Sequence, residues 1–318
     1  MDKPRDEMTA LTSSKIRILV LVAVLIAVIA IRVQAQNRGV YPLGMSATNS
    51  GVTPGAGFTY VNQLLFYSRD HAKDDAGNTK TVTGENYVLM DMNTLAWVSK
   101  KKLLGGAAFS AAATLPFAKN SLTSDIEGKI SGGGGFADSY YLPFILGWNR
   151  DRIAVRAIYG FLAPTGRFVA GASDNVGSGY WTHALSSGQS FYLKSNKHLV
   201  LSTFQLYEFH TRQEDTHIQP GDTFNLDYSL MGSLPAPGKL QLQIGAVGYE
   251  QRQTTTKTGP TISPAASEER YAVNSLGFAL NSAFPQHRAS LGLKYFKEFR
   301  NRSTFQGYSL QLSGSISF

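Results

Sequence analysis

The sequence contains no cysteine among its 318 residues, and this absence excludes disulfide bonds and thiolate metal sites. Charged residues are scarce too: they make up 16% of the chain, against 43% for hydrophobic residues, which is low for an average soluble protein. By contrast, there are 31 glycines, 15 tyrosines and 18 phenylalanines. This composition is typical of many β-strands that are joined by tight turns and edged with aromatic side chains.

Long apolar runs are also missing, except for one near the N-terminus. Residues 18–31 (ILVLVAVLIAVIAI) are uninterrupted and follow the basic residues Lys15 and Arg17. A basic flank, an apolar stretch of about 7–15 residues and a small residue at the cleavage site are typical of a secretory signal peptide. The run is shorter than the roughly 20 residues of a transmembrane helix. We therefore predict a signal peptide over 1–35, cleaved after Ala35; an uncleaved inner-membrane anchor is the alternative.

No second apolar run follows, so a membrane-embedded mature chain must be a closed β-barrel. In lipid, only helices and closed barrels satisfy every backbone polar group. The last segment has the clearest strand pattern, since Tyr308, Leu310, Leu312, Ile316 and Phe318 alternate with polar residues. Similar alternation elsewhere predicts an all-β fold, a transmembrane antiparallel β-barrel over 57–318. About twelve strands are expected, over 57–68, 84–98, 103–115, 131–147, 153–163, 178–194, 198–212, 222–232, 239–252, 270–282, 288–299 and 305–318.

The connections between these strands alternate in length, as they do in bacterial barrels with short periplasmic turns and longer outer loops. The expected outer loops include 69–83, 116–130, 164–177 and 253–269, whereas the expected periplasmic turns are short. Pro143 predicts a bulge within its strand. A soluble β-sandwich or propeller is the alternative fold. Aromatic residues near strand ends favour the barrel, because they are typical of interfacial girdles; they are Tyr140, Tyr141, Trp148, Tyr180, Trp181, Tyr192, Phe296 and Phe299.

Several short motifs resemble those of one outer-membrane family. They are Val40–Gly44, Gly135–Asp138, Tyr141–Pro143, Gly147-Trp148, Tyr159–Arg167, Gly177–Trp181, Tyr207–Phe209, Gln219–Asp222, Asp227-Tyr228 and Glu298-Phe299. In their order and spacing they resemble the family called "putative MetA-pathway of phenol degradation", the SphA-like transporters, from about residue 40 to 318. The resemblance implies a Gram-negative outer-membrane barrel that admits hydrophobic compounds, aromatic ones among them.

Strand charges are expected on the lumen side, because a charge at the lipid-facing midplane costs about 2–4 kcal/mol. By strand parity, Arg156, Asp227, Lys294 and Glu298 face the lumen. These four residues are therefore candidates for lining a permeation path. Alternatively, they pair with one another and stiffen a filled barrel.

The segment 36–56 has no strand or helix period and is rich in glycine, serine, threonine and proline. It is either a flexible periplasmic tail or a plug that folds into the barrel. In the second case Tyr41, Leu43 and Met45 are the candidates for contact with apolar cargo.

The residues that could support catalysis or calcium binding do not have the spacing that these functions need. His183 and Ser186 would face opposite sides of a strand, and Ser187 would lie about 13 Å from His183 along it, so no nucleophile–base pair forms. The acidic residues at 70–75 lack the spacing of a calcium loop. We therefore expect no enzyme activity, no metal, no cofactor and no nucleic-acid partner.

The sequence thus predicts an outer-membrane channel for uptake of small hydrophobic compounds. A closed barrel with a structural or surface-binding role is the alternative. The expected partners are outer-membrane lipid, the barrel-assembly machinery and a small hydrophobic ligand. Phe318, the last residue, is the expected assembly signal for that machinery.

The signal-peptide prediction is tested by sequencing the N-terminus of protein extracted from membranes. We expect the mature chain to begin at Gln36, because the small residue Ala35 ends the predicted leader. A chain that begins at Met1 would contradict cleavage and favour the inner-membrane anchor.

Overall fold

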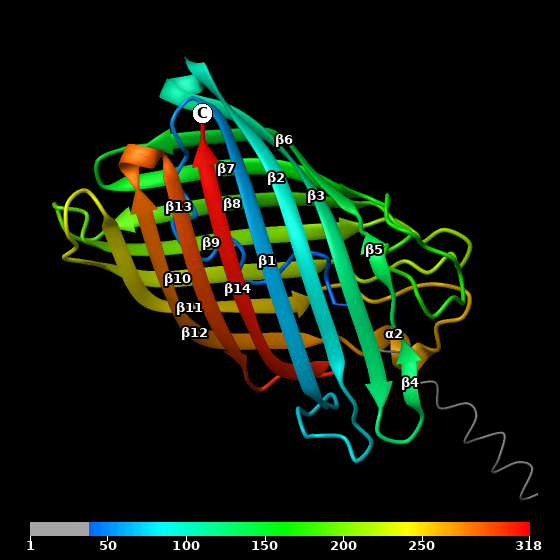
Figure 1. Ribbon diagram of the computed structural model, residues 1–318. Helices are drawn as coiled ribbons and strands as arrows, with labels where there is room; N and C mark the ends of the chain where they lie inside the picture. Colours follow the sequence, from blue (N-terminus) through cyan, green and yellow to red (C-terminus); the bar gives the residue numbers. More distant parts are fainter. Residues whose placement is uncertain (1–37) are drawn as a thin grey trace, which may run out of the picture. The chain divides into compact units, whose positions relative to one another are not determined.

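The structure, a computed structural model, describes residues 38–318. The predicted signal peptide, its cleavage site and the first two residues of the 36–56 segment lie outside the described residues. Within 38–318, twelve long strands form one antiparallel sheet, which confirms the predicted fold (Figure 1). They are β1 (Gly57–Ala72), β2 (Asn86–Leu103), β3 (Ala107–Ser124), β6 (Ser139–Asn149), β7 (Ile153–Ala163), β8 (Thr182–Tyr192), β9 (Leu199–His210), β10 (Thr223–Leu234), β11 (Gln241–Gln253), β12 (Ala272–Phe284), β13 (Ala289–Glu298) and β14 (Phe305–Ser317).

The sheet closes into a barrel because its first and last strands pair with each other. β1 pairs with β2 along one edge and with β14 along the other, from Thr59 opposite Ser317 to Ala72 opposite Phe305. β3 likewise pairs with both β2 and β6. Closure leaves none of the twelve long strands as a free edge, as a membrane requires.

The remaining regular elements are short and lie between the long strands. β4 (Gly128–Ser131) and β5 (Gly134–Phe136) pair with the distal half of β3. Two 3₁₀ turns, η1 (Leu104–Gly106) and η2 (Pro285–His287), join β2 to β3 and β12 to β13. The helix α2 (Pro264–Glu268) is capped by Ser263, whose hydroxyl accepts from the Ala266 N–H at 3.2 Å. Among the described residues, no helix is both long enough and apolar enough to cross a membrane.

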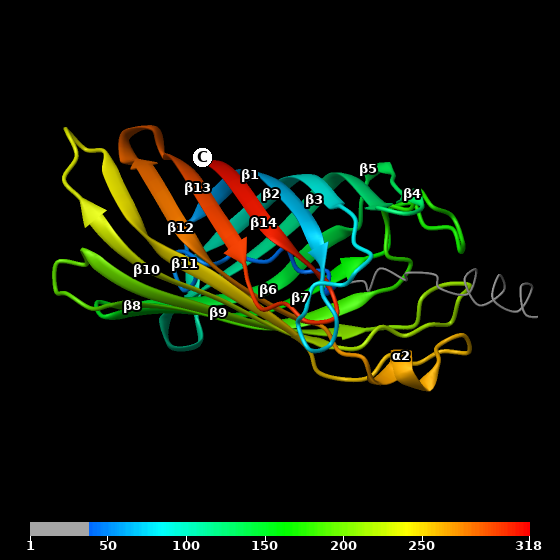
Figure 2. The same ribbon diagram turned by 90° about the horizontal axis from the view of Figure 1, so that it is seen from below.

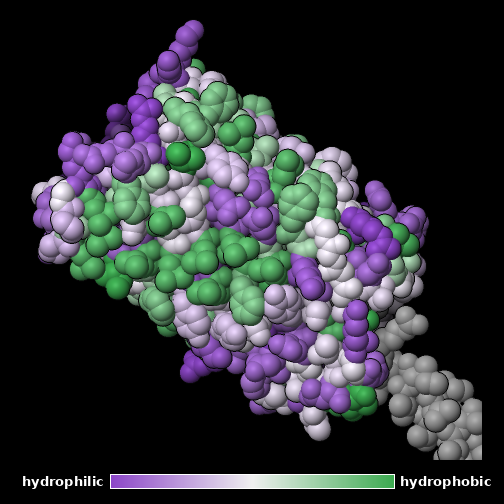
Figure 3. Space-filling model, viewed as in Figure 1, coloured by the Kyte–Doolittle hydropathy of each residue, from purple (hydrophilic) through white to green (hydrophobic). Residues whose placement is uncertain are grey.

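Side chains alternate between the outer face and the lumen along each strand, as the period of two requires. On β14, Leu310 and Leu312 are 37% and 46% exposed, whereas Ser309 and Gln311 are 0% and 3% exposed. Phe318 continues the outer row, and its N–H donates to the Phe58 carbonyl at 2.9 Å. Figure 3 shows hydrophobic residues across the middle of this outer face and hydrophilic residues gathered toward both ends. The barrel wall therefore has the apolar belt of a membrane-spanning protein.

The two ends of the barrel differ in the length of their connections (Figures 1 and 2). One end carries only short turns, at 104–106, 150–152, 193–198, 235–240 and 285–288, together with the C-terminus. The other end carries the longer connections, at 73–85, 125–138, 164–181, 211–222 and 254–271, and the shorter one at 299–304. By the rule for bacterial barrels, the short-turn end faces the periplasm and the loop end faces outward.

Residues 116–130, predicted as an outer loop, are mostly strand, so that prediction was wrong. β3 continues through Pro116 to Ser124 and turns back into β4. A proline normally breaks a sheet because it has no N–H to donate. Here the ladder with β6 ends at Thr114, and the Pro116 carbonyl still accepts from the Ala137 N–H at 2.9 Å. Pro116 therefore lies beyond the end of the β3–β6 ladder, so the N–H that proline lacks is not required for pairing with β6.

The bulge predicted at Pro143 is confirmed, since the β6 register shifts between Tyr141 and Phe144 against β7 and also shifts against β3. The girdle prediction was wrong for Tyr180 and Phe296, which are 3% and 0% exposed, and for Tyr140 and Tyr192, which face the lumen by their registers. Phe296 faces the lumen, where its ring lies 4.9 Å from that of Tyr249. Phe296 lies on the same face of β13 as Lys294 and Glu298, so its side chain points into the lumen although it is close to the end of the strand.

Candidate functional site

The N-terminal described segment, residues 38–56, runs inside the barrel from the loop end to the start of β1 (Figures 1 and 2). At the loop end, the Arg38 guanidinium donates to Thr304 and to the Phe305 carbonyl. At the short-turn end, Gly51 contacts Ser190 and Thr53 contacts Asn149. We call residues 38–56 the lumen segment.

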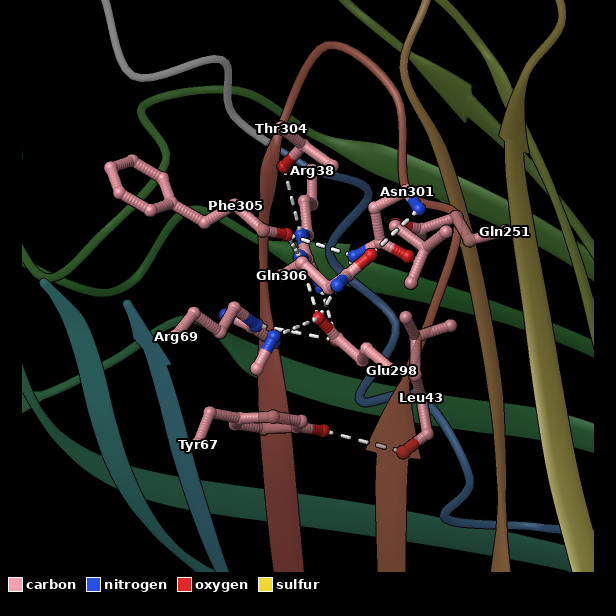
Figure 4. Close-up of polar contacts among 12 residues, drawn as sticks. Arg38, Leu43, Tyr67, Arg69, Gln251, Glu298, Asn301, Thr304, Phe305 and Gln306 are labelled. Atoms are coloured by element: carbon pink, nitrogen blue, oxygen red, sulfur yellow. Dashed lines mark hydrogen bonds and ion pairs between the residues drawn. The ribbon is translucent and has the colours of Figure 1, made fainter. Parts of the chain in front are cut away.

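The outer part of the lumen segment is held by a buried carboxylate, Glu298, on β13 (Figure 4). The Arg38 guanidinium donates to both oxygens of Glu298, at 2.7 and 3.1 Å. Arg69 on β1 donates to the same carboxylate at 3.3 Å, Tyr249 at 3.0 Å and Asn301 at 2.9 Å. Glu298 is only 1% exposed, so these donors replace the water that the carboxylate loses on burial.

The middle of the segment is fixed by Asp227 on β10, which is fully buried. Its carboxylate accepts from the Tyr41 hydroxyl at 2.6 Å and from the N–H groups of Gly44 and Ser46 at 2.9 and 3.1 Å. A backbone without regular secondary structure has unpaired N–H groups, and a charged acceptor pairs with them strongly.

The carbonyl groups of the same turn are paired by donors from other strands. Lys294 on β13 donates to the carbonyls of Gly44 and Met45 at 2.7 and 2.6 Å. Gln311 on β14 and Tyr67 on β1 donate to the Leu43 carbonyl at 2.7 and 3.3 Å. Asp227 and Lys294 therefore hold opposite sides of one turn of backbone.

The inner part of the lumen segment is held mainly through its backbone. The Arg156 guanidinium on β7 donates to the Ser50 carbonyl at 2.7 Å. The Gly51 N–H donates to the Ser190 hydroxyl at 3.0 Å. Asn149 accepts from the Thr53 N–H at 3.2 Å and donates to the Thr53 carbonyl at 2.8 Å.

The four charged residues singled out by parity thus all contact the lumen segment. Within the described residues, the salt bridges of Glu298 are with Arg38 and Arg69, and none joins two of these four residues. Strand parity predicted that these four charged residues face the lumen, but it did not predict which residues they contact there. Arg69 was missed because it was placed in a loop, although it continues the inward row of Leu65 and Tyr67. No sequence pattern pointed to Arg38.

The apolar side chains of the lumen segment pack against the barrel wall. Tyr41 and Leu43 are 6% and 3% exposed, and the Tyr41 ring stacks on Phe204 at 5.6 Å. Both belong to a buried cluster that also includes Tyr249 and Phe296. Met45 is partly buried and also packs against a second cluster on β1 and β2, formed by Leu65, Tyr67 and Met92 with Val88 and Met90.

Glycine is required at two positions of the lumen segment where the barrel wall lies very close to its backbone. A side chain at Gly39 would meet the Glu208 carboxylate, Thr223 and Gln251. Gly44 has a positive φ of 80°, a conformation that favours glycine, and a Cβ there would lie 2.5 Å from the Phe296 ring. The segment therefore fits the lumen closely along these residues.

Space remains at the short-turn end of the lumen. A cavity of about 710 Å³ lies between the segment, at Thr48, Asn49 and Val52, and the ends of β8 to β14. Its wall is rich in uncharged hydrogen-bonding groups, including Gln243 and Asn281. This cavity is large enough for a small organic molecule.

Two residues weighed as a catalytic pair lie on opposite faces of β8. His183 is exposed on the outer face, where its ring is hydrogen-bonded to the Tyr159 hydroxyl at 2.9 Å, and Ser186 lies on the inner face. Among residues 38–318, no cluster of three or more histidines and carboxylates could hold a metal ion.

We predict that Glu298→Ala destabilises the folded barrel by about 3–5 kcal/mol, because it leaves two buried guanidinium groups, those of Arg38 and Arg69, without their carboxylate. Urea unfolding of the detergent-solubilised barrel, followed by tryptophan fluorescence, measures this loss. The control is Arg167→Ala, which breaks an ion pair whose side chains are 53% and 50% exposed and should cost less than about 1 kcal/mol. Equal losses in the two variants would contradict an anchoring role for Glu298.

The fold is similar to those of several solved outer-membrane barrels. The COG4313 outer membrane channel from Pseudomonas putida F1 is 15% identical, with a TM-score of 0.67 over 85% of this chain and 98% of that one. The β domain of the Bordetella autotransporter BrkA is 12% identical, with a TM-score of 0.49 over 83% and 100% of the two chains. The translocator domain of NalP from Neisseria meningitidis is 12% identical, with a TM-score of 0.48 over 86% and 92%. Because the identity is low, the similarity to the first structure shows only that the fold is shared. The TM-scores of the other two structures are below 0.5, so these similarities support no argument.

A comparison with curated proteins gave no significant match. The closed barrel with its apolar belt is the architecture of Gram-negative outer-membrane proteins, and the protein is located there. The family model described as "Putative MetA-pathway of phenol degradation" matches residues 70–313, which is most of the chain. The resemblance found in the sequence motifs is thereby confirmed, and the chain belongs to this family.

Proposed function

We propose that the protein is an outer-membrane channel for the uptake of small hydrophobic compounds, with aromatic compounds as the first class to test. The observation that carries the proposal is an apolar surface inside the barrel. Five inward positions on β1 and β2 form a continuous apolar cluster: Leu65, Tyr67, Val88, Met90 and Met92. Water-filled porins have polar interiors, so these residues suit a different cargo.

Part of this inner surface is accessible. Val88 and Met90 point inward by register, opposite Tyr67 and Leu65, yet both are only partly buried. Met45 of the lumen segment packs against the same residues. Methionine side chains are unbranched and adaptable, and they are common at surfaces that bind apolar ligands of varied shape. The description of the family also names phenol degradation, which supports an aromatic cargo.

In this proposal the lumen segment is a plug that narrows the barrel. Arg156, Asp227, Lys294 and Glu298 hold the plug, while Tyr41, Leu43 and Met45 form its apolar surface. Cargo would pass beside Met45 along β1 and β2 and leave through the cavity at the short-turn end. No catalytic step is proposed for this passage.

The test is uptake of a panel of aromatic and aliphatic compounds by cells with and without the protein. We expect faster uptake of apolar members when the protein is present. Met90→Gln should slow that uptake, because it places an amide on the apolar surface. Val82→Gln, which places the same amide in an outer loop, is the control. No difference across the panel would favour a closed barrel with a structural or surface-binding role.

The plug is tested by deleting residues 38–50 and measuring the leak of small polar solutes from vesicles that contain the folded protein. We expect the leak to rise, because the deletion removes the backbone that Asp227, Lys294 and Arg156 hold in the lumen. An unchanged leak from a correctly folded variant would refute the plug.

We also propose that Phe318 is the signal read by the barrel-assembly machinery. Phe318 is 67% exposed at the end of the outer row of β14, where a partner can reach it. Deleting Phe318 should lower the amount of folded barrel in the outer membrane without changing which panel compounds the remaining barrel takes up. Normal assembly of the shortened chain would contradict this role.

A further inference from the structure

Basic residues gather at the short-turn end of the barrel. Three lysines stand at 100–102, and two arginines flank Asp151 in the turn 150–152. The turn 193–198 has two lysines, and Lys239 and Arg288 lie in the last two turns. These turns and the strand residues 99–103 together carry nine basic residues and one acidic residue, besides the C-terminal carboxylate. We call these nine residues the basic rim.

The basic rim is available to a partner. All nine residues are exposed, and among the described residues none of them forms a salt bridge. Within residues 38–318, two contacts at the rim use a charged head group: Arg150 donates to the Gly105 carbonyl at 2.8 Å, and the Lys197 ammonium lies 4.8 Å from the Tyr192 ring centre. Unpaired cations at this density repel one another, so binding of an anionic partner relieves the repulsion.

The loop end does not share this excess. Its six connections, at 73–85, 125–138, 164–181, 211–222, 254–271 and 299–304, carry nine basic and twelve acidic residues. The positive charge of the barrel is therefore a property of one end, and the composition of the whole chain does not explain it.

The distribution of the basic rim indicates the kind of partner. Four of the five turns at this end carry at least one basic residue, and Lys100, Lys101 and Lys102 lie on β2 just before the fifth turn, so the charges follow the circumference of the barrel (Figure 1). A docked protein contacts one sector of such a circumference, whereas lipid head groups surround all of it. The charges also stand at the ends of the strands, beyond the apolar belt, and Trp148 lies at the same end of β6, two residues before Arg150.

We propose that the basic rim binds the head groups of anionic phospholipids in the periplasmic leaflet. Lysine and arginine beside a membrane attract anionic lipid within a Debye length, and each adds to the attraction. The rim would thus collect an anionic lipid shell around one end of the barrel. This proposal requires only that the barrel spans a membrane and is independent of what passes through the lumen.

The test compares two tryptophans in one membrane. One single-tryptophan protein keeps Trp148 at the basic rim and carries Trp97→Phe and Trp181→Phe. The other keeps Trp181, near the loop end, and carries Trp97→Phe and Trp148→Phe. Each is reconstituted into phosphatidylcholine vesicles with increasing brominated phosphatidylglycerol, whose bromine atoms quench the fluorescence of adjacent tryptophan. Both ends of the barrel then meet the same lipid mixture.

We expect phosphatidylglycerol to be enriched around Trp148 but not around Trp181, by roughly fivefold for each basic residue that a head group meets. High salt should reduce the enrichment. Replacing Lys100, Lys101, Lys102, Arg150 and Arg152 with glutamine should abolish it at Trp148, whereas Lys73→Gln with Lys80→Gln at the loop end should not. Equal quenching at the two tryptophans would overturn the proposal, as would enrichment that persists in the five-residue variant. If that variant does not fold, the comparison of the two tryptophans and the salt response still decide.

Discussion

Every structural feature of this protein depends on one constraint: inside a membrane, no backbone N–H or C=O group can go without a partner. The chain meets the constraint by pairing β1 with β14, whose residues are more than 230 positions apart in the sequence, from Thr59 opposite Ser317 to Ala72 opposite Phe305. Closure in turn separates two environments along every strand. One face meets lipid and is apolar, and the other faces an enclosed lumen where polar and charged residues are allowed.

The lumen then has a constraint of its own, because charges enclosed there must still be paired. Asp227 and Glu298 are almost fully buried, and Lys294 is only 4% exposed. Their partners come largely from residues 38–56, whose irregular backbone has N–H and C=O groups that also need partners. The barrel interior and the lumen segment therefore satisfy each other's polar groups. This mutual pairing accounts for charged strand residues that would otherwise destabilise the wall.

The sequence predicted most of the strands of the barrel wall but few of the contacts between the wall and the lumen segment. Strand alternation predicted twelve strands, the outward row of β14 and the inward side of Asp227 and Lys294, because period two is a local property. It failed at Pro116, where a ladder happened to end, and at Phe296, where an aromatic residue near a strand end packs inward. Arg38 has no periodic neighbours, so its pairing with Glu298, 260 residues later, could be recognised only in three dimensions.

The pairing of β1 with β14 has a consequence for the order of assembly. β14 follows the other eleven long strands along the chain, so one side of β1 has no partner until β14 arrives. An unpaired strand edge is a template for association with other chains, and contacts between distant residues form slowly. Each molecule must therefore be shielded from its neighbours until its own β14 has paired with β1.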